Sequence, residues 1–362
     1  MLCSVSNSGS GTASAAVVGA SGYAGAELLR LLSGHPALHV VHATADSNAG
    51  TPVGRLYPSL GAAYPDVVLA AFDPEAVAGV DVVFLALPHG ESQRIVAGIL
   101  GRVGHVVDLG ADFRLPADTY ARWYGAEHGA PELLDSFAFG IPELFAAEIE
   151  AAEHVASPGC YPTAAALALA PLVADGMVEG SGLTVDAMSG ISGRGRGLSA
   201  ASLFSEAADD VTAYGLLDHR HTGEIEFALA QVARKRTATG VSPPEVLFTP
   251  HLVPAVRGIF ATCHARPAVD GLSTASLLDH YRRFYEGCRF VEVLDEAPHT
   301  KATSGSNAAH VTVRVDERTG RVLALAALDN LGKGAAGQAV QNANLLLGLP
   351  EDAGLGSVGL WP

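Results

Sequence analysis

Residues 15–32 read AAVVGASGYAGAELLRLL, a short apolar run followed by a glycine-rich turn and a leucine-rich segment. Gly19, Gly22 and Gly25 have the G-x-x-G-x-x-G spacing. A strand, a glycine turn and a helix in this order bind a pyrophosphate, because glycine lets the backbone approach the phosphates and the helix N-terminus attracts their charge. The stretch therefore predicts a dinucleotide-binding domain at the first strand of the chain.

Further apolar runs continue this pattern. Strands are predicted at residues 38–43, 81–87 and 105–109, with a helix at 91–100 and a possible short strand at 67–71. Continuous apolar runs suit parallel strands that are covered on both faces. Strands that alternate with helices indicate a doubly wound α/β sheet of the Rossmann type.

The pattern changes beyond residue 157, where strands become more frequent than helices. Such a stretch predicts an α+β domain with a mixed sheet. Helices are predicted from Pro162 and at 224–234, and strands at 184–188, 246–249, 258–265, 290–294, 310–315 and 322–327. We therefore expect a disordered tail (1–14), a dinucleotide-binding domain (15–156), a catalytic, substrate-binding and oligomerisation domain (157–332), and a C-terminal segment (333–362) whose helix returns to the dinucleotide-binding domain.

The composition excludes several classes of protein. The chain of 362 residues has 22 Lys and Arg against 38 Asp and Glu, a net charge of −16, which argues against nucleic-acid binding and against a polybasic membrane surface. No apolar run reaches the roughly 18–20 residues that span a bilayer. The four cysteines form no C-x-x-C pair, so we expect reduced thiols and a cytoplasmic protein.

Cys160 lies in the segment SPGCYPT, residues 157–163. Pro162 suits the first turn of a helix, so Cys160 is predicted just before a helix N-terminus. The positive end of a helix dipole lowers the pKa of a thiol and favours the nucleophilic thiolate. A buried structural cysteine is the alternative, but the Pro- and Gly-flanked turn favours the nucleophile.

Residues 218–224 read DHRHTGE and place two histidines at a predicted helix start. His219 or His221 could relay protons to a sulfur or a carbonyl oxygen. A polar capping cluster is the alternative interpretation. We expect no metal site, because the chain offers no evident further ligands.

Three further loops suit anions or nucleotides. They read SGISGRGR at 189–196, HLVPAVRG at 251–258 and DNLGKGAAGQ at 329–338. Glycine N–H groups and arginine side chains bind phosphate or carboxylate. After the second predicted strand, Asp46 would favour NAD, whereas the hydroxyls of Thr44 and Ser47 suit the 2′-phosphate of NADP. From the residues alone, the choice between NAD and NADP as the cofactor stays open.

These segments together resemble the N-acetyl-gamma-glutamyl-phosphate reductase family, which is related to aspartate-semialdehyde dehydrogenase. The resemblance runs from about residue 15 to residue 355. The segments that carry it are GASGYAGAELLRLL, DVVFLALPHG, VVDLGADFRL, FGIPEL, PGCYPTA, SGISGRGR, HRHTGEIE, HLVPAVRGI and DNLGKGAAGQAVQNAN. The chain departs from the family at Ser157, where Asn is usual, at Arg194, where a small residue is usual, and after the second strand, where many relatives carry Arg.

The resemblance implies an NADPH-dependent reduction of N-acetyl-gamma-glutamyl phosphate to the semialdehyde, with phosphate release through a thioester on Cys160, in arginine biosynthesis. Cys160 is the implied nucleophile and His219 the implied acid/base. The implied substrate-binding residues are Arg114, Ser157, Ser192, Arg196, His221, Glu224 and Arg257. The implied residues for NADP(H) are Gly19, Ser21, Gly22, Tyr23, Ala24, Thr44, Ser47, Pro88, Gly190, Gly193, Asn330, Gly334 and Gln338. Family members also suggest a homo-oligomer, a dimer or a tetramer.

Two kinds of alternative remain at this point. The same chemistry could act on an aminoadipyl or an aspartyl phosphate, although the aspartyl branch usually has Asn where this chain has Gly159. A protein of another class would be a non-catalytic NADP-sensing redox protein or a metal-dependent hydrolase. The presence of Cys160, His219 and Glu224 together favours an enzyme over a sensor.

Overall fold

The computed structural model describes residues 12–236 and 243–361. This part of the chain forms two units, each with its own sheet. Unit 1 holds the chain up to Ala117, Glu127–Ser157 and Ala335–Leu355, and unit 2 holds Asp118–Ala126, Pro158–Gly334 and Gly356–Pro362. The sequence analysis assigned 118–126 and 356–362 to the first domain and the C-terminal segment. The functional roles expected of the four ranges stay predictions.

The sheet of unit 1 has six strands in the order β2-β1-β3-β4-β6-β5, and every pairing is parallel. The strands are β1 (Ala13–Val18), β2 (Leu38–Thr44), β3 (Val82–Leu85), β4 (His105–Asp108), β5 (Phe137–Phe139) and β6 (His154–Ala156). Alternate residues of β1 enter two cores, Ala15 and Val17 on one face and Ala16 and Val18 on the other. The continuous apolar runs arise because both faces are buried.

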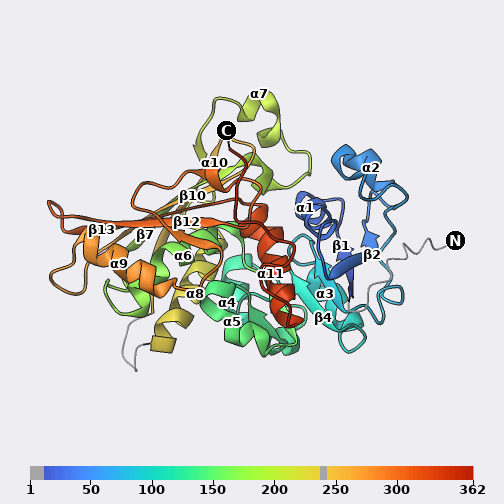
Figure 1. Ribbon diagram of the computed structural model, residues 1–362, viewed down its shortest axis with the longest axis horizontal. Coiled ribbons are helices and arrows are strands. Elements are labelled where there is room, and N and C mark those ends of the chain that lie inside the picture. Colours follow the sequence, from blue (N-terminus) through green and yellow to red (C-terminus); the bar gives the residue numbers. More distant parts are fainter. Residues whose placement is uncertain (1–11, 237–242, 362) are drawn as a thin grey trace. The chain divides into compact units, whose positions relative to one another are not determined.

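Helices cover the two faces of this sheet. They are α1 (Tyr23–Leu32), α2 (Val53–Leu56), η1 (Pro58–Leu60), α3 (Ser92–Ile99), η2 (Pro131–Ser136), α5 (Pro142–Glu150) and α11 (Gly337–Leu346). Figure 1 shows α11, in red, beside β4, which it contacts together with α1 and α5. Ala339, Val340 and Ala343 of α11 enter the same core as Leu28 of α1, so burial of apolar surface returns the C-terminal helix to unit 1.

The sheet of unit 2 has seven strands in the order β11-β12-β13-β10-β7-β9-β8 and mixes parallel and antiparallel pairs. The strands are β7 (Leu183–Gly190), β8 (Thr212–Ala213), β9 (Val246–Val253), β10 (Ile259–Ala265), β11 (Val291–Val293), β12 (Ala309–Asp316) and β13 (Arg321–Leu328). Burial alternates along β9 and β10, because one face packs on helices and the other is more exposed.

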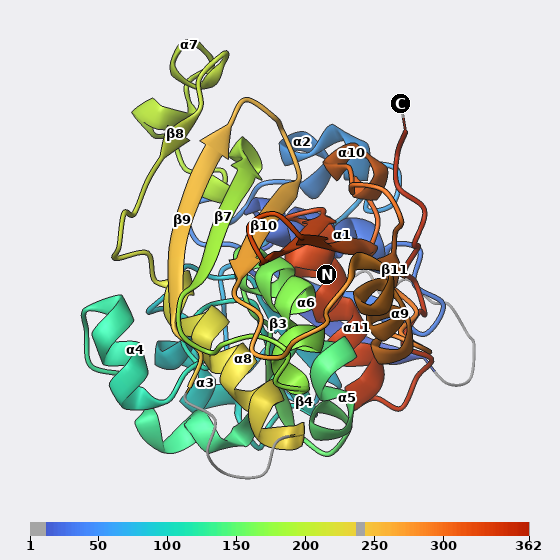
Figure 2. The same ribbon diagram turned by 90° about the vertical axis from the view of Figure 1, so that its left-hand side faces the viewer.

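The helices of unit 2 form around one apolar helix. They are α6 (Cys160–Ala174), η3 (Ile191–Arg194), η4 (Ala200–Ser202), α7 (Phe204–Ala207), α8 (His221–Arg236), α9 (Thr274–Phe284) and α10 (Thr300–Thr303), with most of α4 (Ala117–Tyr124) and the π-helical turn η5 (Gly332–Ala336). Helix α6 is buried from Tyr161 to its end and packs against α8 and β10 (Figure 2).

Several sequence expectations need correction. Residues 67–71 form no strand; Val68 and Ala70 make only isolated bridges, to Pro52 and Thr44. Cys160 is the first residue of α6 rather than a residue before it, because Gly159 occupies the cap position. Ala13 and Ser14 belong to β1 rather than to the tail, and residues 1–11, Cys3 among them, lie outside the described residues.

The remaining differences concern elements that were not predicted from the sequence, namely α2, α4, α5, α7, α9, α10, β5, β6, β8 and the short helices η1, η2, η3 and η4. Strands β5 and β6 have three residues each, too few for a periodic pattern. The alternation of strands and helices in the first half and the mixed sheet in the second half confirm the predicted fold class.

Asp108, at the end of β4, has a carboxyl group that is fully buried. Its Oδ1 accepts hydrogen bonds from Ser92 Oγ and the Gly110 N–H, both at 2.8 Å, whereas its Oδ2 has no partner among the described residues. Burial raises the pKa of this carboxyl to about 7. The unfolded chain releases the same proton near pH 4. Ionisation of Asp108 therefore destabilises the folded protein. This destabilisation is absent below about pH 4, grows as the pH rises, and is complete above about pH 7.

We expect Asp108→Asn to resemble the protonated acid and to titrate no proton. The melting temperature of the variant should match that of the wild type near pH 4 and exceed it increasingly up to about pH 7, measured by calorimetry. Asp66→Asn, which removes the same charge from an exposed loop of unit 1, is the control and should follow the wild type. A constant difference from about pH 4 to pH 7 would contradict the assignment.

Candidate active site

Unit 2 contains a cavity of about 540 Å³, and the side chain of Cys160 forms part of its wall. Tyr161, Tyr214, His219 and His221 also line it. These residues come from the start of α6, from the loop before α8 and from the first residue of α8. The fold thus joins a thiol and two imidazoles that the sequence separates by about sixty residues.

Cys160 occupies the first turn of α6, whose cap residue, Gly159, is in an extended conformation. Gly159 has no side chain with which to cap this helix N-terminus. The backbone N–H groups of a first helical turn lack intrahelical partners, and the dipole there favours negative charge. The position therefore stabilises a thiolate, and it also offers N–H donors to an oxyanion.

Glu224 holds the turn that precedes the cysteine. Its carboxylate is fully buried; Oε2 accepts the Gly159 N–H at 3.1 Å and Oε1 accepts the Tyr124 hydroxyl at 2.7 Å. His221 Nε2 lies 3.9 Å from Oε1. A buried carboxylate needs such donors to offset its desolvation. Glu224 therefore contacts the backbone beside the nucleophile, and its contacts are those of a positioning residue.

The imidazole of His219 is packed among aromatic rings. The ring centres of Tyr214 and Phe248 lie 5.4 and 5.3 Å away, and that of Tyr161 lies at 5.9 Å. Burial, together with the charge of Arg220, lowers the pKa of His219 to about 4. Nδ1 lies 3.2 Å from the His221 backbone N–H and accepts it, so the proton of the neutral ring is on Nε2. At neutral pH His219 is therefore a neutral imidazole that carries a hydrogen-bond donor on Nε2.

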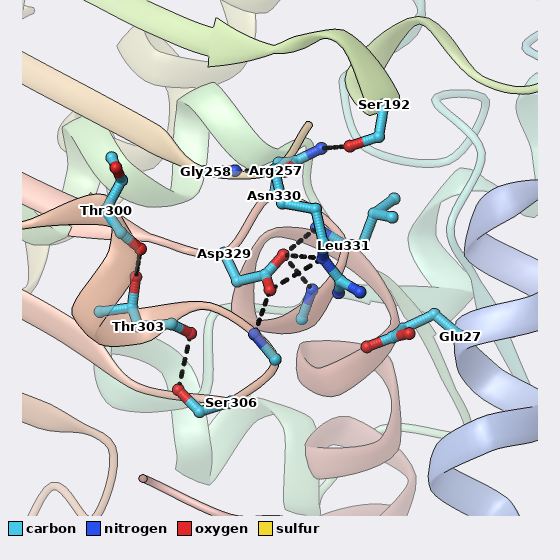
Figure 3. Close-up of polar contacts among 12 residues, drawn as sticks. Glu27, Ser192, Arg257, Gly258, Thr300, Thr303, Ser306, Asp329, Asn330 and Leu331 are labelled. Carbon is cyan, nitrogen blue, oxygen red and sulfur yellow. Dashed lines mark hydrogen bonds and ion pairs between the residues drawn. The ribbon is translucent and has the colours of Figure 1, made fainter. Parts of the chain in front are cut away.

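A second buried carboxylate organises the glycine-rich loop that follows β13. Asp329 is fully buried and accepts Arg257 Nε at 3.0 Å and the backbone N–H groups of Gly305, Leu331 and Gly332 (Figure 3). The neighbouring Asn330 accepts the Gly258 N–H at 2.7 Å and donates to Ser192 Oγ at 2.9 Å (Figure 3). These bonds connect the loops at 192, 257–258 and 331–334, which the sequence analysis assigned to anions and nucleotides.

Gly334 of this loop lies against the side chain of Cys160. Its N–H donates to the Asp329 carbonyl at 2.8 Å. A Cβ at position 334 would lie 2.6 Å from Cys160 Cβ, so only glycine fits. The Asp329 network therefore fixes a backbone segment directly against the base of the cysteine side chain.

The other predicted substrate residues have varied surroundings. Arg114 is buried in unit 1 and donates to the carbonyls of Ser157 and Leu109 at 2.8 and 2.7 Å. Ser157 is also buried, and its N–H donates to the Asp108 carbonyl. Arg257 pairs with Asp329, whereas Arg196 is exposed and does not line the cavity. Roles of Arg114, Ser157, Ser192, Arg196 and Arg257 in substrate binding stay predictions.

The glycine turn of unit 1 has the geometry that a dinucleotide needs. Gly19 has φ +87°, and a Cβ there would meet the Ala86 carbonyl oxygen at 2.3 Å. Gly22 is the cap residue of α1 and has no side chain that could bond the first N–H groups of the helix, so these groups face the turn. At the end of β2 the buried Thr44 Oγ1 has no hydrogen-bond partner among the described residues. Free helix N–H groups and an unsatisfied hydroxyl fit the phosphate and ribose of a nucleotide.

The remaining predicted cofactor residues divide between the units. Ser21, Tyr23 and Ala24 lie in the same turn, and the Ser21 carbonyl accepts the Tyr57 hydroxyl at 2.8 Å. Ser47 and Pro88 are exposed after β2 and β3, and Gln338 is buried in α11. Gly190, Gly193, Asn330 and Gly334 belong to unit 2. Their contacts to a cofactor stay predictions.

The sequence analysis missed residues whose importance depends on the fold. Tyr124 supports Glu224 from α4, a helix that was not predicted. Tyr214 donates to the Tyr161 hydroxyl at 3.2 Å, and Tyr161 donates to the His251 carbonyl at 3.0 Å. Asp329 was quoted only as part of a loop. The aromatic segment around Tyr124 was the one available signal, since its pattern of aromatic and charged residues suits an amphipathic helix.

Two negative observations apply to the described residues. Within residues 12–236 and 243–361, no group of three or more His, Cys, Asp or Glu side chains could hold a metal ion. In the same ranges, none of the helices has both the length and the apolar character needed to cross a membrane.

Comparisons with known proteins agree on one family. The model of the semialdehyde dehydrogenase NAD binding domain matches residues 14–152, and that of the semialdehyde dehydrogenase dimerisation domain matches residues 160–330. N-acetyl-gamma-glutamyl-phosphate reductase of Desulforamulus reducens is 46% identical and covers 96% of this chain and 99% of its own. That of Symbiobacterium thermophilum is also 46% identical, with 95% and 97% covered. Aspartate semialdehyde dehydrogenase with NADP from Candida albicans has a TM-score of 0.69 at 18% identity and covers 92% of this chain and 98% of its own.

Gly334→Ala tests the contact between the glycine loop and the nucleophile. The added methyl group has no room beside Cys160, so the loop or the cysteine must move, and we expect kcat/KM to fall by about a hundredfold or more, as misplacement of reacting groups by about 1 Å does. Gly356→Ala is the control, because a Cβ there meets no atom within 4 Å, and it should keep wild-type activity. Equal activities of the two folded variants would show that the contact is unimportant.

Proposed function

Because the chain belongs to the N-acetyl-gamma-glutamyl-phosphate reductase family of the semialdehyde dehydrogenases, we propose that it reduces N-acetyl-gamma-glutamyl phosphate to N-acetylglutamate 5-semialdehyde with release of phosphate, a step of arginine biosynthesis. The observation that carries the proposal is the position of Cys160. It begins a buried helix, borders a cavity with His219, and follows a turn that the carboxylate of Glu224 holds in place.

The protein uses a nicotinamide dinucleotide, which the match to the NAD binding domain supports. We further propose that this cofactor is NADP(H). The hydroxyl of Thr44 is buried without a partner, and Asp46, the acid that would favour NAD, is exposed on the following loop. Gly19, Ser21, Gly22, Tyr23 and Ala24 would hold the pyrophosphate.

Cys160 would act as the nucleophile. The thiol gives up its proton, the thiolate attacks the acyl carbon, the bond from that carbon to the phosphate oxygen breaks, and phosphate leaves carrying one proton. The thioester that forms on Sγ divides one difficult reduction into two easier steps. The N–H groups at the start of α6 would stabilise the oxyanion that develops during the attack.

When bound, the nicotinamide supplies the hydride that reduces the thioester carbonyl. The role of His219 follows from its tautomer. Its Nε2–H donates to the oxygen of the resulting thiohemiacetal, which then collapses to the aldehyde and the Cys160 thiolate, and a solvent proton restores the thiol. A neutral donor fits this task because it needs no proton from bulk water before the carbonyl reacts.

The other predicted residues would act around this centre. We propose Arg114, Ser157, Ser192, Arg196, His221 and Arg257 as residues that shape or contact the substrate site, and Ser47, Pro88, Gly190, Gly193, Asn330, Gly334 and Gln338 as residues near the cofactor. Glu224 would act through Gly159. A homo-oligomer and a cytoplasmic location stay predictions.

The direct test is the reverse reaction. N-acetylglutamate 5-semialdehyde, phosphate and NADP⁺ are mixed with the wild type and with Cys160→Ser, and NADPH formation is followed by absorbance. We expect phosphate-dependent turnover that the variant loses by at least about a thousandfold, since the thioester can no longer form. NAD⁺ in place of NADP⁺ tests the cofactor and should react more slowly. Turnover by Cys160→Ser at the wild-type rate would remove Cys160 from the mechanism.

The pH dependence tests the state of His219. A pKa of about 4 keeps the imidazole neutral from pH 5 upwards, so its protonation should inhibit only near pH 4 and not near 6.5. His219→Gln retains a side-chain N–H donor and should lower kcat/KM while the shape of the profile between pH 5 and pH 8 stays that of the wild type. If the wild type has a limb between pH 6 and pH 7 that this variant lacks, the neutral assignment is wrong.

A further inference from the structure

The cavity beside Cys160 has a cationic wall. Arg194 and Arg220 line it, and none of the residues that line it is Asp or Glu. The whole chain carries a net charge of −16, so a cavity without acidic side chains in its wall is a local exception. Such a cavity concentrates anions. The proposed substrate has two anionic groups, its phosphate and its α-carboxylate.

The two arginines have different neighbours. The charge of Arg220 contributes to the low pKa of His219, and its guanidinium lies 5.7 Å from the ring centre of Tyr124, which bonds Glu224. Arg220 is therefore close to the reacting centre. Arg194 lies 5.3 Å from the ring centre of Tyr214, and its charge acts on the hydroxyl of that ring. Arg194 therefore lies at the part of the cavity wall that Tyr214 forms.

The setting of Arg194 suits a carboxylate. A guanidinium that stacks on an aromatic face keeps its N–H edge directed outward, and this edge pairs with a carboxylate through two parallel hydrogen bonds. The ring of Tyr214 is fixed by its hydrogen bond to Tyr161, the residue next to the nucleophile. The glycines on both sides of Arg194, Gly193 and Gly195, leave its side chain without bulky neighbours along the chain.

We propose that Arg194 binds the α-carboxylate of the substrate and thereby selects N-acetylglutamyl substrates over analogues that lack this group. The inference rests on the proposed function, because the carbon chain of the proposed substrate carries the carboxylate. It concerns a residue at which this chain departs from the family it resembles, where a small residue is usual. Arg194 and the neighbouring candidate Arg196 are both exposed, but only Arg194 lines the cavity.

The test compares two aldehydes in the reverse reaction, N-acetylglutamate 5-semialdehyde and 4-acetamidobutanal, which is the same molecule without the carboxylate. Arg194→Ala should raise KM for the first aldehyde about tenfold or more, with the loss in KM rather than kcat, because a hydrogen bond to a charged group contributes about 1.5–3 kcal/mol. It should leave kcat/KM for 4-acetamidobutanal and KM for phosphate within twofold of the wild type. Arg194→Lys, which keeps the charge, should recover part of the loss.

Arg318→Ala is the matched control, because it removes one positive charge from an exposed side chain of unit 2 outside the cavity. It should change neither KM. Equal losses of Arg194→Ala on the two aldehydes would overturn the inference, and so would a rise of KM for phosphate, which would assign Arg194 to that group. A wild type that does not turn over N-acetylglutamate 5-semialdehyde would instead refute the proposed function itself, and the inference with it.

Discussion

The position of Cys160 depends on one requirement, that a carboxylate removed from water must be surrounded by donors. Glu224 meets it with the N–H of Gly159 and the hydroxyl of Tyr124. Asp329 meets it with a guanidinium and three backbone N–H groups. Each carboxylate thereby fixes a segment of backbone on either side of Cys160. Both acids, Glu224 and Asp329, are fully buried.

Helix α6 also holds Cys160 in a fixed position. From Tyr161 to its last residue the helix is buried against α8 and the sheet, so its first turn cannot shift without disturbing the core. A cysteine at the start of such a helix is held to within the small tolerance that nucleophilic attack requires. The strongly apolar sequence of α6 therefore serves the chemistry as well as the stability of the unit.

Charge is arranged on two scales in this protein. The chain as a whole is acidic, whereas the cavity beside the cysteine presents two arginines and two histidines, and burial keeps His219 neutral. The neutral imidazole avoids repulsion with Arg220 in a poorly solvated site. A positive cavity in an acidic protein can collect a small substrate with two anionic groups without attracting nucleic acid.

The sequence by itself determined the elements with strong local signals. The glycine turn, the apolar strands of unit 1, the helix that begins at the cysteine and the HRH segment could each be read from spacing and composition, because those properties are set by neighbouring residues. The fold class followed from the alternation of strands and helices. Strands of three residues such as β5 and β6 could not be predicted, since so short a segment has no period.

Only the tertiary structure decided which of these residues meet. In the folded chain Glu224 accepts a hydrogen bond from the backbone before Cys160, and Arg257 pairs with Asp329. Arg194 lines the cavity, whereas Arg196 does not. It also set the protonation of His219, because the aromatic rings that bury it come from α6, the loop before α8 and β9. Burial and pairing between residues far apart in the chain depend on packing in three dimensions, and a linear pattern of side chains does not contain that information.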